Sequence, residues 1–275
     1  MRRWWNWQTR QFEGLLGQPM GVQIPLSAPF IMCCVSRPKA NSDFFKTWSG
    51  DMAYVLGFIV TDGCLVEHKN GYNALNITNK DKGILKKILL VMDSDHKISV
   101  KSRGSAPEYR YFQIQIRNKN IYDDLLKLGL TPRKSKTIRM PIVPSEFFGD
   151  FVRGCFDGDG AVSVWQDPRW KHAWQIRSVF CSGSLAFLQV MQKRLCEKAD
   201  LSKGSIQRLA REYLLCYSIA DSIKLHDAIY KKINYRSLFF KRKKDKFEFF
   251  RKVRPEKFTN VAPSSSLAQD VRFSA

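Results

Sequence analysis

The sequence YVLGFIVTDG at Tyr54–Gly63 decides the fold, because a second version of it, FVRGCFDGDG, stands at Phe151–Gly160. In each copy an apolar segment carries a glycine at its fourth position and ends in an aspartate followed by a glycine. Such an apolar segment, with a small residue in its middle, predicts a helix. The copies stand about a hundred positions apart, well beyond the ~20–50 residues of solenoid repeats. They therefore predict a chain of two similar halves.

Each copy also carries a pair of small residues. Residues four apart share one face of a helix, and this spacing joins Gly57 to Thr61 and Gly154 to Gly158. Small side chains let two helix backbones approach closely. We therefore expect the two segments to pack on these faces, which would bring Asp62 and Asp159 side by side at the end of the helix pair.

This pattern resembles the LAGLIDADG homing endonucleases in their single-chain form with two motifs. Motif positions three, eight and nine are present in both copies, as Gly57, Asp62 and Gly63 and as Gly154, Asp159 and Gly160. The first copy departs from the family at position six, where Val60 stands in place of the second copy's Asp157. The resemblance implies an α+β fold of two pseudo-symmetric αββαββα repeats. Each repeat would hold a four-stranded antiparallel sheet, the sheets would form a saddle over DNA, and the motif helices would pack at the centre.

Composition limits the partner class. The 275 residues carry a formal net charge of +21, with a pI near 9.8, and 44% of them are hydrophobic. A globular protein with so large a positive excess fits a polyanion such as nucleic acid; a ribosomal or membrane-surface protein is the alternative. The longest apolar runs, about seven or eight residues, are too short to span a membrane. Seven cysteines without a Cys-x-x-Cys pair indicate reduced thiols and an intracellular location, in cytoplasm, nucleoid or an organelle matrix.

Local patterns predict the same order of elements in both halves. In the first half the motif helix is followed by strands at Cys64–Glu67 and Asn73–Thr78, a helix at Lys80–Met92 capped by Thr78 or Asn79, strands at Lys97–Lys101 and Tyr109–Arg117, and a helix at Lys119–Leu128. In the second half we expect a motif helix at Ser145–Gly158, strands at Ala161–Trp165 and Ala173–Phe180, a helix at Ser184–Lys198, strands at Ser205–Leu209 and Tyr213–Ile219, and a helix at Ser222–Ile233.

The predicted organisation has six parts. They are an N-terminal arm at 1–41, the first repeat at 42–129, a linker at 130–144, the second repeat at 145–236, a basic helix at 237–258 and a disordered tail at 259–275. Two interpretations of the first residues stay open. They form a genuine arm, or they precede a real translation start at Met32 or Met52.

By resemblance, Asp62 and Asp159 bind metal, one in each active site, with the backbone carbonyls of Thr61 and Gly158 completing each shell. Hard oxygen ligands suit Mg²⁺ or Mn²⁺. A lone Asp-Gly is more often a turn, but the paired context favours metal binding. Asp157, two positions from Asp159, falls on another helical face and is predicted to be structural. The family also implies basic residues near the sites, and the candidates here are Lys134, Lys136, Lys241 and Lys243, each of which has a solvated surface position as its alternative.

The polar faces of the predicted strands would contact DNA. Glutamine and arginine suit contacts with adenine and guanine in the major groove, and a β-ribbon can enter that groove. The candidates that alternate on polar strand faces are Gln113, Gln115, Arg117, Gln175 and Arg177. Further candidates at strand or hairpin positions are Lys101, Arg103, Gln207, Arg208 and Arg211. The alternative is an ordinary solvated sheet face.

The resemblance implies a site-specific, monomeric DNA endonuclease of a mobile genetic element, which makes a staggered double-strand cut. Two alternatives share the scaffold. One is a maturase that binds its host intron RNA, and the other is a catalytically inactive DNA-binding regulator. The presence of both Asp62 and Asp159 favours the nuclease.

Overall fold

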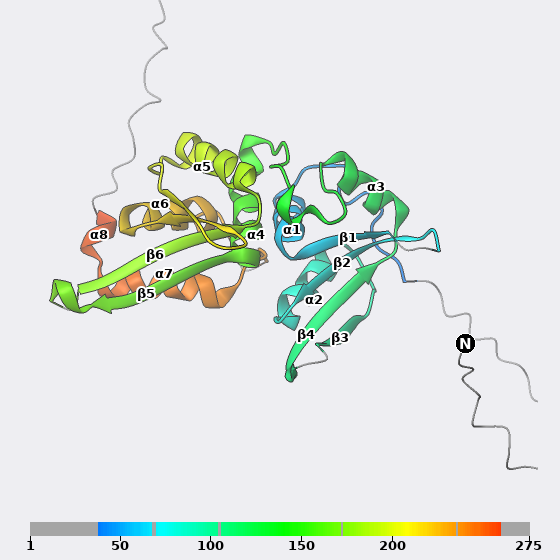
Figure 1. The fold of residues 1–275 in the computed structure, drawn as a ribbon, viewed down its shortest axis with the longest axis horizontal. Helices are drawn as coiled ribbons and strands as arrows, with labels where there is room; N and C mark the ends of the chain where they lie inside the picture. Colours follow the sequence, from blue (N-terminus) through cyan, green and yellow to red (C-terminus); the bar gives the residue numbers. More distant parts are fainter. Residues whose placement is uncertain (1–37, 68–69, 104–105, 172, 235, 260–275) are drawn as a thin grey trace, which may run out of the picture. The chain divides into compact units, whose positions relative to one another are not determined.

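The computed structural model describes residues 38–67, 70–103, 106–171, 173–234 and 236–259 (Figure 1). The described residues all belong to one compact unit. Most of the predicted N-terminal arm and nearly all of the predicted disordered tail lie outside the described residues.

The first half contains three helices and four strands among its described residues. In chain order they are α1 (Gly50–Asp62), β1 (Gly63–Glu67), β2 (Asn73–Asn79), α2 (Lys82–Val91), β3 (Ile98–Arg103), β4 (Ala106–Ile116) and α3 (Lys119–Lys127). The strands pair antiparallel in the order β1-β2-β4-β3. Ser49 caps α1, since its hydroxyl accepts the Met52 N–H.

The second half repeats this order. After the 3₁₀ turns η1 (Lys134–Lys136) and η2 (Ser145–Phe147) come α4 (Phe148–Asp159), β5 (Gly160–Asp167), η3 (Pro168–Trp170), β6 (Ala173–Ser182), α5 (Leu185–Ala199), β7 (Ser205–Arg208), β8 (Tyr213–Tyr217) and α6 (Ile219–Tyr230). The sheet order β5-β6-β8-β7 matches that of the first half. Two helices follow, α7 (Lys241–Val253) and α8 (Glu256–Thr259). The predicted αββαββα repeat is confirmed.

The motif helices α1 and α4 pack through their small residues. A Cβ atom on Gly57 would lie 2.2 Å from the Phe151 carbonyl oxygen, and one on Gly154 would lie 2.1 Å from the Tyr54 carbonyl oxygen. Both distances are far below van der Waals contact, so only glycine permits this approach at either position. The predicted contact between the motif helices is confirmed, and nearly the whole of α1 is buried, from Met52 to Val60.

Each sheet buries one face. In β4, Ile114 and Ile116 are almost fully buried, whereas Gln113 and Gln115 between them are partly exposed. In β6, Ile176 is buried and Arg177 next to it is partly exposed. Helices cover the buried faces, as Figure 1 shows for α5 and α6 beside β6. The opposite faces are the outer faces.

Several element boundaries differ from the sequence prediction by a few residues, and three of them have a clear physical reason. Asp81, rather than Thr78 or Asn79, caps α2, because its carboxylate accepts the N–H groups of Gly83 and Ile84. The second motif helix opens with the 3₁₀ turn η2 before the α-helix begins at Phe148. Helix α6 begins three residues before Ser222, whose hydroxyl donates to a backbone carbonyl instead of capping the helix. None of the described helices is long and apolar enough to cross a membrane.

Candidate active site at the ends of the motif helices

The two motif aspartates end the two packed helices. Asp62 is the last residue of α1 and Asp159 the last of α4. The helix ends are in contact, since a Cβ atom on Gly158 would lie 1.9 Å from the Thr61 hydroxyl oxygen. The carboxylates also interact, because the charge of Asp159 raises the pKa of Asp62. The helix packing therefore places an acid from each half at one shared position.

Burial opposes the charging of both acids, and a neighbouring carboxylate adds to this effect at each. Burial is the first cause that raises the pKa of Asp62, and repulsion by Asp159 is the second; together they bring it to about 6. Partial desolvation raises the pKa of Asp159 even though the residue is exposed, Lys134 and Lys243 act to lower it, and Glu212 raises it. A pair of crowded, partly desolvated carboxylates is an environment that a bound cation would stabilise.

Asn79 holds the Asp62 carboxylate and was not found from the sequence. Its side-chain N–H donates to Asp62 Oδ2 at 2.7 Å. Its amide oxygen accepts the Asp81 N–H at 2.8 Å, so the orientation of the amide is fixed. The sequence offered one indication of this role: Asn79 has both a donor and an acceptor group and lies two residues before the residue that caps α2.

The second half has a different residue at the position of Asn79. In the sheets Gly63 pairs with Ile77 and Gly160 with Phe180, so Ser182 corresponds to Asn79. The Ser182 hydroxyl accepts the Ser184 N–H at 3.1 Å, which repeats the Asn79 turn. Among the described residues, no hydrogen bond joins Ser182 to Asp159 as Asn79 is joined to Asp62. The two carboxylates are therefore held unequally.

Two of the four candidate lysines lie beside the carboxylates. Lys134 and Lys243 are each only 5% exposed. Lys134 Nζ donates to the Gly63 carbonyl oxygen at 2.5 Å, and Lys243 Nζ donates to the carbonyl oxygens of Asp157 at 2.7 Å and Gly160 at 2.6 Å, and to that of Phe156. Burial lowers the pKa of Lys134, and it lowers that of Lys243 to about 8. Each half thus places a buried lysine against the backbone just after its motif helix.

The other two candidate lysines are exposed. Lys136 projects from η1, and Lys241 forms an ion pair with Asp245 at 2.7 Å. Asp157 is fully buried and accepts hydrogen bonds from Tyr54 and from the Phe240 N–H, both at 2.8 Å. Its position in the interior agrees with a structural residue and not with a metal ligand open to substrate.

Most of the candidate DNA-contact residues lie on the outer faces of the two sheets. Lys101, Gln113 and Gln115 share the outer face of the first sheet by strand alternation, and exposed Arg117 follows the end of β4. On the second sheet, the Arg177 guanidinium donates to Gln207 at 3.3 Å, while Gln175 and Arg177 alternate with buried Ile176.

Three DNA-contact candidates fall elsewhere. Arg208 is exposed, but it alternates with Gln207 and lies on the same side of its strand as Ile206, whose pair Leu215 is buried. Arg211 is exposed in the turn between β7 and β8. The Arg103 side chain lies outside the described residues.

Comparison with solved structures identifies the fold. The LAGLIDADG meganuclease I-AabMI bound to uncleaved DNA aligns with a TM-score of 0.52 and 12% identity, over 77% of this chain and 92% of that chain. This chain has the LAGLIDADG fold. The homing endonuclease I-WcaI bound to its DNA recognition sequence aligns with a TM-score of 0.49 and 15% identity, over 74% and 90% of the two chains. The N-terminal LAGLIDADG domain of DUF199/WhiA aligns with a TM-score of 0.45 and 16% identity, over 71% and 90%. The sequence matches no protein-family model and no curated protein.

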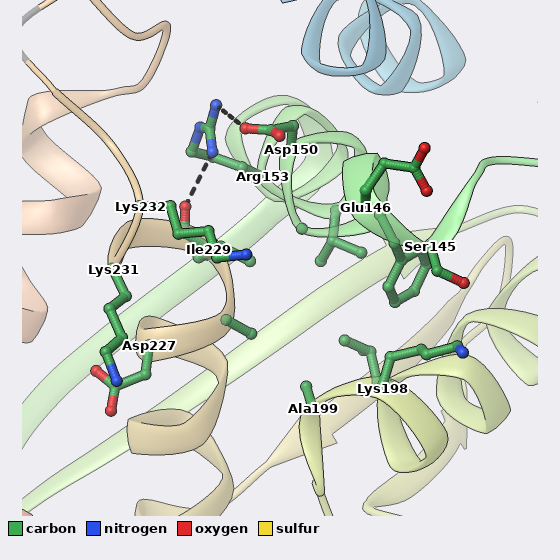
Figure 2. A pocket seen from close by; sticks show the side chains of 15 residues that line it. Ser145, Glu146, Asp150, Arg153, Lys198, Ala199, Asp227, Ile229, Lys231 and Lys232 are labelled. Atoms are coloured by element: carbon green, nitrogen blue, oxygen red, sulfur yellow. Dashed lines mark hydrogen bonds and ion pairs between the residues drawn. The ribbon is translucent and has the colours of Figure 1, made fainter. Parts of the chain in front are cut away.

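A separate pocket of about 230 Å³ lies at the other end of α4 in this LAGLIDADG scaffold (Figure 2). The N-terminal residues of α4 and the C-terminal residues of α5 and α6 line it. Arg153 inside it donates to Asp150 at 2.7 Å and to the Ile229 carbonyl at 3.1 Å, as the dashed lines show. Arg153 is the last residue of α4 that lines this pocket, so the C-terminal part of α4 separates it from Asp159 and from the candidate active site.

Proposed function

We propose that this protein is a metal-dependent endonuclease that recognises a specific duplex DNA site and cuts both strands to leave staggered ends. One observation carries the proposal: α1 and α4 end in contact, and each delivers an aspartate to the same position beside a buried lysine. The internal repeat relates the two acids, and approximate two-fold symmetry relates the two strands of a DNA duplex. Each acid can therefore serve one strand.

The donor set fits a hard divalent cation. Asp62 and Asp159 would hold Mg²⁺ or Mn²⁺, together with the backbone carbonyls of Thr61 and Gly158. A bound cation would supply an activated water and would neutralise charge on the phosphate. Among the described residues no three His, Cys, Asp or Glu side chains gather into a metal site. We therefore expect phosphate oxygens of the DNA to complete the coordination, so that metal binding depends on substrate.

The chain's own residues prepare this position. Lys134 and Lys243 provide positive charge beside the carboxylates without approaching solvent. Such fixed charges can stabilise negative charge as it develops on a phosphate. Asn79 orients the Asp62 carboxylate through its 2.7 Å hydrogen bond.

The outer sheet faces would hold the duplex. They carry Gln113, Gln115, Gln175, Arg177 and Gln207, whose side chains suit base edges in the major groove. The net charge of +21 would attract the phosphate backbone. I-AabMI, which shares this fold, is bound to uncleaved DNA in its solved structure.

A regulator that only binds DNA is a weaker proposal. Burying two lysines and crowding two carboxylates opposes stability, and a protein that only bound DNA would gain nothing from these groups. Their presence in both halves supports a catalytic use.

The test is cleavage of a randomised duplex library with Mg²⁺, followed by sequencing of the cut ends. The parent is compared with Asp62→Asn and Asp159→Asn, and Asp123→Asn on α3 is the matched control. We expect the parent and the control to cut one family of sites, and both motif variants to bind that site without cutting both strands. Equal cutting by all four proteins would remove the carboxylates from the reaction.

A further inference from the structure

Asp157 occupies a position that stability alone does not explain. The side chain is fully buried, and all of its hydrogen bonds reach Oδ2. Its other oxygen, Oδ1, is buried without a hydrogen-bond partner among the described residues. Burial of a carboxylate with an unsatisfied oxygen is unfavourable. Val60 stands at the matching position of α1, so an apolar residue suits the same place in the repeat.

The two hydrogen bonds of Asp157 connect different parts of the molecule. One comes from the Tyr54 hydroxyl on α1, and the other from the Phe240 N–H at the start of α7, each at 2.8 Å. Phe240 is the N-cap residue of α7, and its own side chain supplies no capping hydrogen bond. The Asp157 carboxylate therefore binds the N-terminus of α7, where negative charge is favourable.

Phe240 is in turn hydrogen-bonded to Lys243 through the backbone. The Phe240 carbonyl accepts the N–H of Lys243 at 3.0 Å, which forms the first turn of α7. The Lys243 side chain then returns to α4 and donates to the carbonyls of Asp157 and Gly160, on either side of Asp159. Thus Asp157 fixes the start of the helix whose third residue lies beside the candidate active site.

The first half lacks this connection. Lys134 lies in the short turn η1, which has no side-chain cap, and its Nζ donates to one carbonyl, that of Gly63. Val60 cannot accept a hydrogen bond from the η1 backbone. The two lysines are therefore positioned by different means, Lys134 by its linker turn and Lys243 by a helix bound to a buried acid.

We propose that Asp157 is a positioning residue for Lys243: by holding the Phe240 N–H it orients α7, so that Lys243 lies against the end of α4. The proposal rests on the proposed nuclease function for its kinetic readout. It predicts that loss of Asp157 affects the cutting of one DNA strand, because Lys134 in the other half does not depend on α7.

The experiment measures the single-turnover cutting rate of each strand separately, on a duplex carrying the selected site and a different label on each strand. Lys243→Met and Lys134→Met assign the strands, since each should slow a different one. Asp157→Val should slow the strand that Lys243→Met slows, by about 10- to 100-fold, the size expected when a reacting group is misplaced. The other strand should change by less than about threefold, because its lysine keeps its position.

Three variants separate positioning from general stability. Asp157→Asn keeps an oxygen that can accept the Phe240 N–H, and should retain both rates within about threefold. Tyr54→Phe removes an equally short, equally buried hydrogen bond to Asp157 that does not reach α7, and should not alter the ratio of strand rates. Val60→Ala weakens the core at the matching position and should slow neither strand selectively. If the valine variant does not fold, Asp157→Ser takes its place, because the shorter hydroxyl cannot reach Phe240.

Equal slowing of both strands by Asp157→Val or Asp157→Ser would show a structural role only and overturn the proposal, as would unchanged rates. If the parent cuts no duplex, the proposed nuclease function fails instead. Hydrogen exchange then tests the positioning role directly: loss of Asp157 should speed exchange at the amides of residues 240–244 and leave those of 134–138 unchanged. Unaltered exchange at residues 240–244 would also overturn the proposal.

Discussion

Asp62 and Asp159 end equivalent helices but have different neighbours. Asn79 donates a hydrogen bond to Asp62, whereas Ser182 at the matching position bonds only its own turn. Burial and repulsion by Asp159 raise the pKa of Asp62 to about 6, while burial, with a smaller effect of Glu212, raises that of Asp159. The two halves of the candidate site are therefore chemically unequal.

Metal binding should depend on pH through Asp62. A proton and a cation compete for the same carboxylate, and the pKa of about 6 means that the proton is bound at mildly acidic pH. The apparent affinity of the protein–DNA complex for Ca²⁺ should therefore rise with pH up to about 6 and level off above it. Asn79→Ser removes a bond that lowers this pKa and should move the step to higher pH. A titration series between pH 5 and pH 8 checks this, and a flat profile would contradict it.

Without metal, the same carboxylate should destabilise the fold at neutral pH. A raised pKa means that the folded protein holds the proton more tightly than the unfolded chain does, so stability falls as pH rises from near 4 to about 6 and stays lower above that. Asp62→Asn should therefore raise the unfolding free energy by about 1–3 kcal/mol at pH 8 and leave it nearly unchanged at pH 4. Chemical denaturation in EDTA measures both, with Asp123→Asn as the control. A variant that is less stable at both pH values would refute this account.

The sequence predicted the two acids, but it could not select among their neighbours. The motif spacing alone placed Asp62 and Asp159 at the helix ends. Lys134 and Lys136 are two residues apart in a short linker, and only the path of η1 decides which of them turns inward. Asn79 required knowledge of strand pairing, because it lies beside Asp62 only after β2 pairs with β1.

At the scale of elements, the contact between α1 and α4 organises the molecule. Gly57 and Gly154 each lie against the backbone of the opposite helix. The two helix axes can lie this close together because neither residue has a side chain. The same contact joins the helix ends that carry the acids. Small residues at a spacing of four thus determine both the packing and the position of the site.

Alanine at either glycine should separate the motif helices. The new methyl group would lie 2.1–2.2 Å from a backbone oxygen, which no side-chain movement can relieve. Gly57→Ala and Gly154→Ala should each lower the unfolding free energy by about 2–5 kcal/mol. Gly83→Ala on α2 is the matched control, since its methyl group would meet only the Asp81 carboxylate, and it should change stability by less than about 1 kcal/mol. Equal effects of all three substitutions would contradict the packing account.

The order of elements could be predicted because both halves carry the same periodic pattern. Each helix or strand that the local pattern indicates only weakly in one half has a counterpart in the other half. Boundaries were harder. Several side chains near the start of α2 can cap a helix, and the choice of Asp81 follows from Asn79 being committed to Asp62 and to its own turn. Helix α6 extends to Ile219 because Ser218 already has an extended backbone.

At the scale of the whole molecule, charge and the outer sheet faces determine the proposed partner. The full sequence carries a net charge of +21, and the outer sheet faces combine basic residues with glutamine side chains. The pocket beside α4 carries exposed lysines as well, including Lys198 on α5, which covers the inner side of the second sheet (Figures 1 and 2). Only the outer faces would meet the duplex in the proposed complex.

DNA binding should weaken steeply as the salt concentration rises, and this salt dependence should change when a lysine of the outer sheet face is substituted but not when a lysine elsewhere is. Each neutralised phosphate contributes about −0.9 to the slope of log K against log salt concentration, so six to ten contacts give a slope of roughly −5 to −9. Lys101→Ala on the outer face should weaken binding to all sequences evenly and reduce the slope by about 1. Lys198→Ala removes the same charge from α5, on the helix side of the second sheet, and should leave the slope unaltered. Fluorescence anisotropy between 50 and 300 mM salt checks this, and equal effects of the two variants would place the DNA elsewhere.

The most direct test of the account is a crystal structure of the protein with its selected duplex and Ca²⁺. The account predicts cation density within about 2.3–2.6 Å of carboxylate oxygens of Asp62 and Asp159 and of the phosphates where the strands are cut. The duplex should lie along the outer faces of both sheets. Cations bound away from these two acids, or a duplex resting on the helices, would contradict it.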